Sequence, residues 1–348
     1  MELKKAISIV LSLAMSVQML SVYAFAVDDN GEIPEMAQIV INENGFGDIQ
    51  ETRALYDVNN IEVATCLDFE NAYLIYLSNG VVVEYSEKDN SDYFGTDEKA
   101  YYGGPLAYYK QEGNQYVDLV SDESVPEEIF EQQSESIKDI EMPVRDNNSS
   151  NQVMRTSLPS DEKAVMLPHR LRIDLNYNTK GTCVALATTI MLFYYYQYIS
   201  TDYIPFSFFV QYPEALHDYL VTNYFKPVDG EYGQTIDEAI SRTNKYFADR
   251  KLNNTAYFKY YSDVPLYSQI YDSIVNHQRP LIMFLHYNPE SISEWAINHA
   301  VVVHGLTNPD VYGQRGYAFY YVNDGAGHND KAIFDSSAYI TGVLRYKY

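Results

Sequence analysis

The chain has 348 residues, of which 46% are hydrophobic, so it is long enough for two domains and apolar enough to bury a core. Its formal net charge is −24, and residues 27–150 account for most of it, with 28 Asp and Glu against 6 Lys and Arg. Residues 151–348 carry 19 Asp and Glu against 16 Lys and Arg. Neither half therefore has the basic excess that favours nucleic acid or an anionic membrane as a partner.

Residues 1–26 have the pattern of a cleavable export signal. Two lysines precede an apolar run over residues 6–22, and the small residues Ala24 and Ala26 are spaced as at a cleavage site. The run is short for a retained membrane anchor, which is the alternative interpretation, and no later apolar run approaches the length of a transmembrane helix. We therefore expect a secreted, extracellular protein with no membrane contact after removal of the signal.

Residues 27–120 are predicted to form a small, acidic, β-rich domain. Two strand-like runs at 72–77 and 81–85 flank Ser78-Asn79-Gly80, which is typical of a β-hairpin. Other strand-like runs cover residues 61–67, 106–110 and 116–120. No residues in this domain have the spacing of a catalytic site, and its negative charge is interpreted as a solvated face.

Only two cysteines occur, Cys66 and Cys183, so a disulfide framework is absent. Cys66 lies in the strand-like run 61–67 and is expected to be a buried strand residue. A bridge between the two cysteines stays open for an oxidising compartment, although their spacing does not argue for one.

Residues 121–160 are interpreted as a linker that contains the processing region. Its acidic first part is compatible with a short helix, and the polar run 146–152 is typical of a site that proteases cut. The remaining residues, 161–348, have an α+β pattern in which helices precede a run of strands. Four helices are predicted in this part. The first begins at Cys183, the second covers 213–224, the third begins after the capping residue Thr235, and the fourth covers 265–277. The predicted strands cover 281–287, 300–306, 317–322 and 342–346.

Cys183 begins the longest apolar helix of the sequence. The unpaired N–H groups and the dipole of a helix N-terminus stabilise a thiolate, and a nearby imidazolium lowers the thiol pKa further. We therefore expect a nucleophilic cysteine. Taken alone, the position of Cys183 favours a small, buried, unreactive side chain, and it is the residues downstream that reverse this preference.

Two residues much further along the chain, His299 and Asn323, complete a catalytic pattern with Cys183. His299 lies just ahead of a strand, and Asn323 ends another strand at a glycine-rich turn. A thiol, an imidazole and an amide in this order form a nucleophile, a base and a group that orients the base. An Asn carbonyl can hold the second ring nitrogen without adding charge.

Three motifs resemble those of papain-like cysteine peptidases, especially the bacterial streptopain type and the bacteriocin-processing peptidases. They are Gly-Thr-Cys-Val-Ala-Leu-Ala-Thr at 181–188, Asn-His-Ala-Val at 298–301 and Val-Asn-Asp-Gly-Ala-Gly at 322–327. The resemblance covers roughly residues 160–348. It implies a papain-like α+β peptidase domain in which Cys183 attacks peptide bonds, His299 transfers the proton and Asn323 orients His299. It implies a peptide or protein substrate and no metal or cofactor.

The resemblance to streptopain also gives the N-terminal domain a role. In that family a β-rich propeptide keeps the enzyme inactive until it is cut away. Residues 27–120 are therefore expected to be an intramolecular inhibitor, and the chain a zymogen that is activated by cleavage in the linker. A retained acidic binding domain is the alternative.

The sequence departs from the family pattern at two places. The glutamine that often stands six residues before the cysteine, and that helps the oxyanion hole, is Tyr177 here, with Asn178 as the substitute donor. Loss of one oxyanion donor costs about 10²–10³ in rate. The tryptophan after the catalytic asparagine is also missing, with Ala326 near that place, whereas Trp295 precedes His299.

Two other functions stay open. A transglutaminase-like acyl transferase has the order Cys, His, Asp and would use Asp324, although Val301 stands where its usual aromatic residue follows the histidine. An exported, non-catalytic binding protein on a degenerate peptidase fold is the other.

Overall fold

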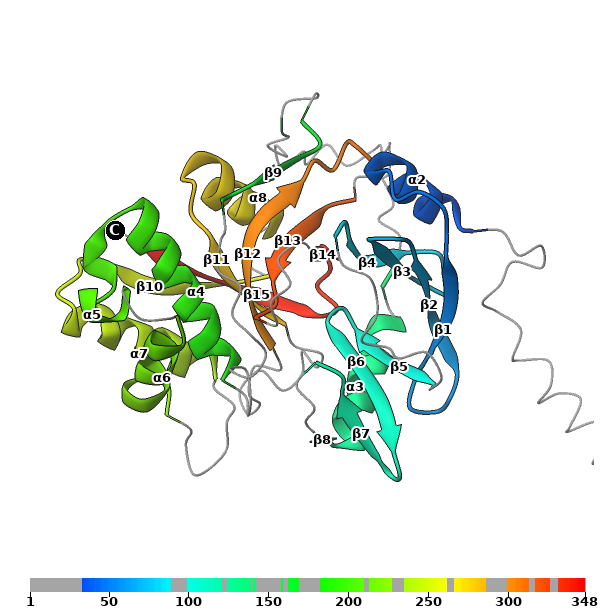
Figure 1. Cartoon of the computed structure of the whole chain (residues 1–348), viewed down its shortest axis with the longest axis horizontal. Coiled ribbons are helices and arrows are strands. Elements are labelled where there is room, and N and C mark those ends of the chain that lie inside the picture. Colours follow the sequence, from blue (N-terminus) through cyan, green and yellow to red (C-terminus); the bar gives the residue numbers. More distant parts are fainter. Residues whose placement is uncertain are drawn as a thin grey trace, which may run out of the picture.

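The fold is described from a computed structural model. The described residues are 33–88, 99–120, 124–138, 140–141, 158, 162–168, 182–209, 213–226, 235–261, 266–285, 299–312, 317–325 and 331–347. They form a mixed α+β fold in which seven α-helices surround one sheet of 15 strands (Figure 1). The predicted export signal and the polar run of the linker lie outside the described residues.

The C-terminal half of the chain forms one part of the sheet. In spatial order its strands are β10 (Thr255–Tyr260), β15 (Ile340–Lys347), β11 (Leu281–Leu285), β12 (His299–Thr307), β13 (Phe319–Asn323) and β14 (Lys331–Phe334). The short strand β9 (Ala164–Met166) pairs with β12. All of these pairings are antiparallel. The four strands predicted in this half are confirmed, whereas β9, β10 and β14 were not predicted.

The N-terminal half continues the same sheet. Its strands follow in the order β4 (Val82–Ser86), β3 (Tyr73–Leu77), β2 (Glu62–Asp68), β1 (Glu51–Tyr56), β5 (Ala100–Gly104), β6 (Ala107–Glu112), β7 (Gln115–Asp118) and β8 (Ser124–Val125). The predicted hairpin is β3–β4. Its turn places Gly80 at a φ of 83°, a left-handed conformation that glycine adopts without strain.

The longest helix, α4 (Cys183–Tyr198), is buried along most of its length. Eleven of its 16 residues are buried, because it packs between the sheet and helix α6 (Pro213–Asn223). Burial on all sides explains why its sequence is continuously apolar rather than amphipathic. Helix α7 (Ile236–Asp249) begins with the predicted cap, where Thr235 Oγ1 accepts the Glu238 N–H in a capping box.

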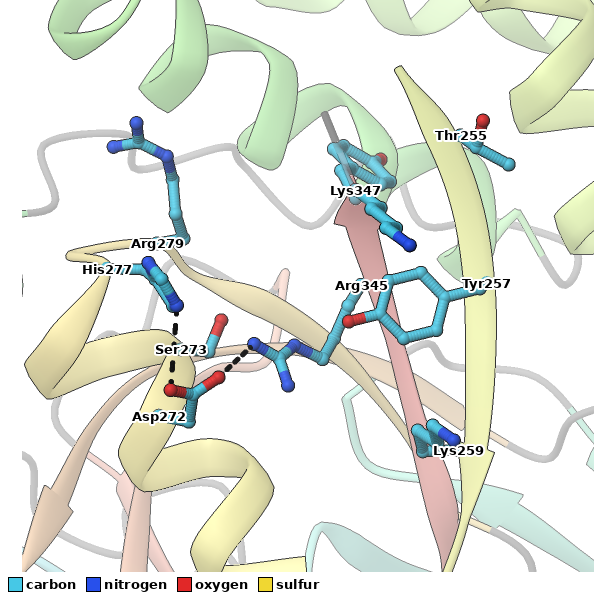
Figure 2. A pocket seen from close by; sticks show the side chains of 10 residues that line it. Thr255, Tyr257, Lys259, Asp272, Ser273, His277, Arg279, Arg345 and Lys347 are labelled. Atoms are coloured by element: carbon cyan, nitrogen blue, oxygen red, sulfur yellow. Dashed lines mark hydrogen bonds and ion pairs between the residues drawn. The ribbon is translucent and has the colours of Figure 1, made fainter.

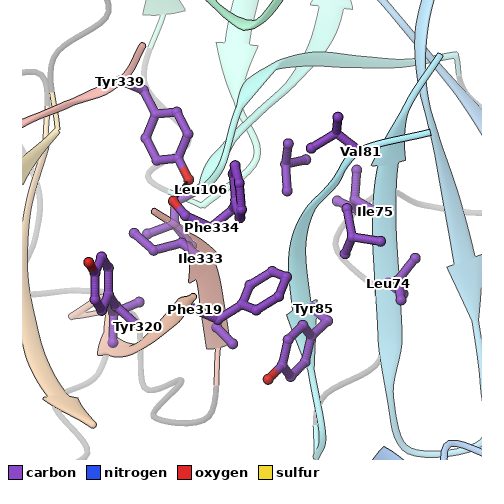
Figure 3. Packing of buried hydrophobic residues seen from close by; sticks show 14 of the residues in the cluster. Leu74, Ile75, Val81, Tyr85, Leu106, Phe319, Tyr320, Ile333, Phe334 and Tyr339 are labelled. Atoms are coloured by element: carbon purple, nitrogen blue, oxygen red, sulfur yellow. Dashed lines mark hydrogen bonds between the residues drawn. The ribbon is translucent and has the colours of Figure 1, made fainter. Parts of the chain in front are cut away.

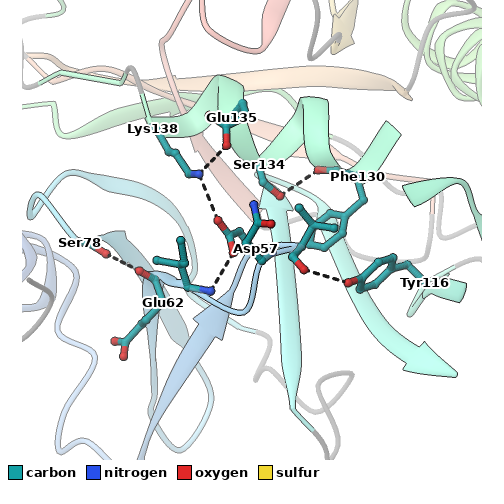
Figure 4. Close-up of polar contacts among 11 residues, drawn as sticks. Asp57, Glu62, Ser78, Tyr116, Phe130, Ser134, Glu135 and Lys138 are labelled. Carbon is teal, nitrogen blue, oxygen red and sulfur yellow. Dashed lines mark hydrogen bonds and ion pairs between the residues drawn. The ribbon is translucent and has the colours of Figure 1, made fainter. Parts of the chain in front are cut away.

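The described residues form four further α-helices. They are α2 (Glu35–Asn44), α3 (Glu127–Lys138), α5 (Phe206–Phe209) and α8 (Leu266–Tyr271), with short helical segments at η3 (Thr201–Tyr203) and η4 (Asp272–Asn276). Helix α3 is held to the N-terminal strands by Lys138, whose Nζ lies 3.1 Å from the buried Asp57 carboxylate (Figure 4). The other carboxylate oxygen of Asp57 accepts the Asn59 and Ile61 N–H groups, so one side chain closes the β1–β2 turn and anchors α3.

The two halves meet where β14 pairs with β4. In this register Ala332 lies opposite Tyr85 and Ile333 opposite Glu84. On one face, Tyr85 packs edge-on against Phe319 with ring centres 5.0 Å apart, and one apolar cluster includes residues from both halves (Figure 3). The Tyr85 hydroxyl lies 3.0 Å from that of Tyr312, so the junction is both packed and hydrogen-bonded.

The opposite face of this junction carries buried charge. Lys331 on β14 is fully buried, and its Nζ lies 3.2 Å from Asp324 Oδ2 and 4.9 Å from the ring centre of Tyr108. Glu84 on β4 is also fully buried and accepts hydrogen bonds from the Tyr73 and Tyr108 hydroxyls. Burial raises the pKa of Glu84, and the charge of Lys331 opposes that rise. The ammonium of Lys331 thus compensates carboxylates from both halves.

Replacing this ammonium tests its contribution to the fold. Lys331→Met should lower the free energy of unfolding by about 3–5 kcal/mol, because it leaves buried carboxylates without a compensating charge. Urea unfolding followed by tyrosine fluorescence measures the difference. As a matched control, Lys163→Met removes an exposed ammonium 2.9 Å from Glu43 and should cost less than about 1 kcal/mol. Equal effects of the two substitutions would contradict the role given to Lys331.

Candidate active site

The fold brings Cys183 next to the strand that carries His299. Cys183 is the first residue of α4, and the Thr182 carbonyl before it accepts the Leu186 N–H at 2.9 Å. The backbone amide of Ala300 hydrogen-bonds the Cys183 thiol, and Ala300 directly follows His299 on β12. Two of the predicted catalytic residues therefore lie on neighbouring backbone segments although 116 positions separate them in the sequence.

The thiol of Cys183 is in its protonated form in this arrangement. Its residue is only 6% exposed, and burial raises the pKa of the thiol to about 11. The backbone amides of Ala300 and Val184 oppose that rise, as expected at a helix N-terminus, but they do not overcome the loss of solvation. The expectation of a lowered thiol pKa is therefore not met here, because no imidazolium offsets the burial.

The ring of His299 interacts with groups other than the thiol. His299 pairs with Leu285, and strand alternation puts it on the face of Val301 rather than on that of Ala300. Burial lowers the pKa of the imidazole, while the Asp324 and Asp118 carboxylates and the Asp324 backbone oppose that shift. Among the described residues no hydrogen bond joins His299 to Cys183. Because the pKa of the thiol is raised and that of the imidazole is lowered, both groups are neutral near neutral pH.

Asn323 lies on the other face of the sheet from His299. It ends β13 opposite Val302, which packs in the same apolar cluster as α4. Its side-chain oxygen accepts the Gly325 N–H at 2.9 Å and so shapes the turn after the strand. The structure thus places Asn323 on the side of Cys183, and places Asp324 on the side of His299.

Three residues near the site carry no recognisable signal in the sequence. Asp118 ends β7 of the N-terminal half and Lys331 begins β14, and both act electrostatically on His299. His217 on α6 is buried, and the backbone of Thr182, which precedes Cys183, acts electrostatically on its imidazole. Each is a single charged or polar residue in an ordinary helix or strand, so only the fold shows its place.

The other predicted site residues fall outside the described residues. These are Asn178, the substitute oxyanion donor, and Trp295. Within the described ranges, no three His, Cys, Asp or Glu side chains are grouped so that they could hold a metal ion. No helix in the same ranges is long and apolar enough to cross a membrane.

Both cysteines are free thiols, so the Cys66–Cys183 bridge is not formed. Cys66 lies on β2 and is fully buried, which confirms the prediction of a buried strand residue.

No protein-family model matches the sequence, and no curated protein matches it. The assignment of a function therefore depends on the chain's own residues and their geometry.

The raised thiol pKa predicts a pH profile for alkylation. In the full chain, the rate of Cys183 carbamidomethylation should be low near neutral pH and should rise about tenfold per unit from about pH 7 to about pH 9.5, since only the thiolate reacts. Peptide mass spectrometry after timed exposure to iodoacetamide measures it, with Cys66→Ser removing the second thiol. A fast rate that is constant down to about pH 6 would show a lowered pKa instead and contradict this description.

Proposed function

We propose that the chain is the zymogen of a secreted, papain-like cysteine peptidase of the streptopain type. In this proposal the peptidase domain is 161–348, and the β-rich domain 27–120 is its propeptide. The observation that carries the proposal is the contact of the Cys183 thiol with the backbone amide of Ala300. This contact puts a cysteine at a helix N-terminus beside the residue that would act as its base.

The reaction would proceed through a thioester. The Cys183 sulfur attacks the substrate carbonyl carbon after its proton passes to His299, and a tetrahedral oxyanion forms. When that intermediate collapses, the C–N bond breaks and His299 returns the proton to the leaving amine. His299 then takes a proton from water, whose oxygen attacks the thioester carbonyl carbon. The C–S bond breaks, the acid is released, and His299 returns the proton to the Cys183 sulfur. The Cys183 N–H and Asn178 would stabilise the oxyanion, and Asn323 would hold the second ring nitrogen of His299.

The protonation states of the two groups support an inactive form. A thiol with a pKa of about 11 beside a neutral imidazole cannot form the ion pair on which cysteine peptidases depend. Activation would therefore need a change that brings the His299 ring to the sulfur and lowers the thiol pKa.

The contacts of His299 and β14 support the N-terminal domain as the inhibitor. Asp118 acts on His299 from the N-terminal half, and Lys331 is compensated partly by Glu84 of the same half. In this proposal the two carboxylates favour the arrangement in which His299 and Asp324 lie on the face of β12 that is turned away from Cys183. Removing the N-terminal domain takes away Asp118 and Glu84 together, which would free His299 to pair with the thiol.

One observation favours a second candidate, a transglutaminase-like acyl transferase. Asp324 rather than Asn323 acts on His299 in this structure, and that class uses a carboxylate as its third catalytic residue. The acyl-enzyme would then pass its acyl group to an amine instead of water.

Self-processing tests the proposed function. Residues 27–348 of the wild type should lose an N-terminal fragment of about 120–140 residues on prolonged incubation, because the small fraction of chains whose N-terminal half has come away is active and cuts the polar linker of the others. Cys183→Ala should remain intact, and intact mass measured at intervals distinguishes the two. Equal processing of both proteins would mean that Cys183 is not the nucleophile.

The same assay separates the two candidates for the orienting residue. If Asn323 orients His299, Asn323→Ala should slow processing by up to about 10⁴-fold, the loss seen when a catalytic histidine is held in the wrong tautomer. Asp324→Asn should process at least as fast as the wild type, since it loosens the hold on His299. The reverse result, together with incorporation of a labelled amine into a glutamine peptide, would favour the acyl transferase.

A further inference from the structure

A pocket rich in basic side chains lies at the end of the sheet formed by β10 and β15. Its volume is about 650 Å³, and its walls come from those two strands, from η4 and from the segment after it (Figure 2). Four cationic side chains line it, against the single carboxylate of Asp272. These cations are Lys259, Arg279, Arg345 and Lys347. Because β15 and β11 separate β10 from β12, the pocket does not include the candidate catalytic residues.

The charge of this pocket stands out against the rest of the chain. Four cations and one carboxylate give it a local charge of +3 with His277 neutral, whereas the whole chain carries −24. The same four residues are a quarter of the 16 Lys and Arg in residues 151–348. Screening limits charge effects to about 8 Å at physiological salt, so a ligand in the pocket meets mainly this local positive potential.

The carboxylate of Asp272 is already used within the pocket wall. Its Oδ2 lies 2.8 Å from Arg345 Nη2, and its Oδ1 lies 3.5 Å from His277 Nε2. Arg345 also donates to Gln269 Oε1 at 3.0 Å, and its guanidinium lies 5.9 Å from the ring centre of Tyr257. Asp272 thus orients Arg345 and does not compensate the lysines.

The two lysines of the pocket have no such partners. Their backbones pair in the β10–β15 ladder, but neither the Lys259 nor the Lys347 ammonium group makes a hydrogen bond or ion pair with another described residue. Figure 2 shows Lys347 and Lys259 toward opposite ends of the strand pair, with Arg345 and Tyr257 between them. The structure thus holds a row of cations, of which the outer two are free to bind an anion.

The spacing of this row points to an extended ligand. Lys347 pairs with Thr255 and Lys259 pairs with Val343, so four strand positions separate the two lysines along β10 and β15. At about 3.3 Å per residue this is a separation of about 13 Å. Side chains of a strand stand roughly perpendicular to the sheet, so the two ammonium groups keep about this spacing, which is wider than a single phosphate or sulfate. An extended peptide along the strands repeats its side chains with the same period, so its carboxylates four residues apart match the two lysines.

We propose that this pocket binds an extended acidic peptide segment, with carboxylates at Lys259 and Lys347. Arg345 and the ring of Tyr257 form the floor between them, and the Thr255 hydroxyl offers a hydrogen bond at the rim. The strand-like repeat favours a peptide over a sulfated oligosaccharide, whose charges are not set by a β-strand period. The binding does not use Cys183, and so it stands or fails apart from the peptidase reaction.

Fluorescence anisotropy tests the proposal with Cys183→Ala protein of residues 27–348, which removes any effect of hydrolysis. The probe is a labelled six-residue peptide of serines with glutamates at its first and fifth positions. It should bind more tightly than a peptide with the two glutamates adjacent. The double variant Lys259→Glu and Lys347→Glu should weaken binding about tenfold or more, because attraction becomes repulsion at both ends.

A matched charge reversal controls for the net charge. Lys163→Glu and Lys226→Glu make the same change at exposed sites outside the pocket and should leave the affinity within about twofold. Equal weakening by the two double variants, or no binding of the peptide, would overturn the proposal. So would tighter binding of a sulfated hexasaccharide that the pocket variant abolishes, because the pocket would then recognise an anionic sugar.

Discussion

The pairing of β14 with β4, and the buried charges behind it, is the constraint on which the rest of the structure depends. This junction makes one sheet and one apolar core from two halves of very different charge. A buried ammonium is costly unless carboxylates surround it, and Lys331 finds them on both sides of the junction, in Glu84 and Asp324. The same side chains therefore hold the halves together and set the charge around the candidate active site.

This coupling accounts for the state of the candidate catalytic groups. Asp324 is at once the ion-pair partner of Lys331 and the residue whose carboxylate and backbone act on His299. While the N-terminal half stays paired, His299 is kept with Asp324, and Cys183 is left buried without an imidazolium. Since burial then dominates the thiol pKa, a helix N-terminus alone does not make a nucleophile. In the proposed zymogen, inhibition would come from this electrostatic arrangement and not only from a blocked cleft.

Much of the fold could be predicted from the sequence where local signals are strong. The hairpin around Asn79, the cap at Thr235 and the apolar helix from Cys183 all follow from short-range rules, and each is confirmed. Strand β14, with Lys331 at its start, could not be predicted. It has only four residues, and a lysine at its first position does not fit the apolar pattern of a buried strand. The sites of Cys183 and His299 were visible as motifs, but the face on which His299 lies depends on pairings between distant strands. The basic pocket likewise arises from residues far apart in sequence, which only the β10–β15 register brings together.

The most direct measurement asks whether the two halves stay associated after the linker alone is cut. A cleavage site for a sequence-specific protease, inserted within residues 146–152 of the Cys183→Ala chain, allows the peptide backbone between the halves to be cut without self-processing. The account predicts that the two fragments stay associated in native mass spectrometry at neutral pH and separate only in denaturant, because the sheet and its buried charges remain paired. Fragments that part on cleavage in plain buffer would contradict it, since the β14–β4 junction would then not hold the halves together.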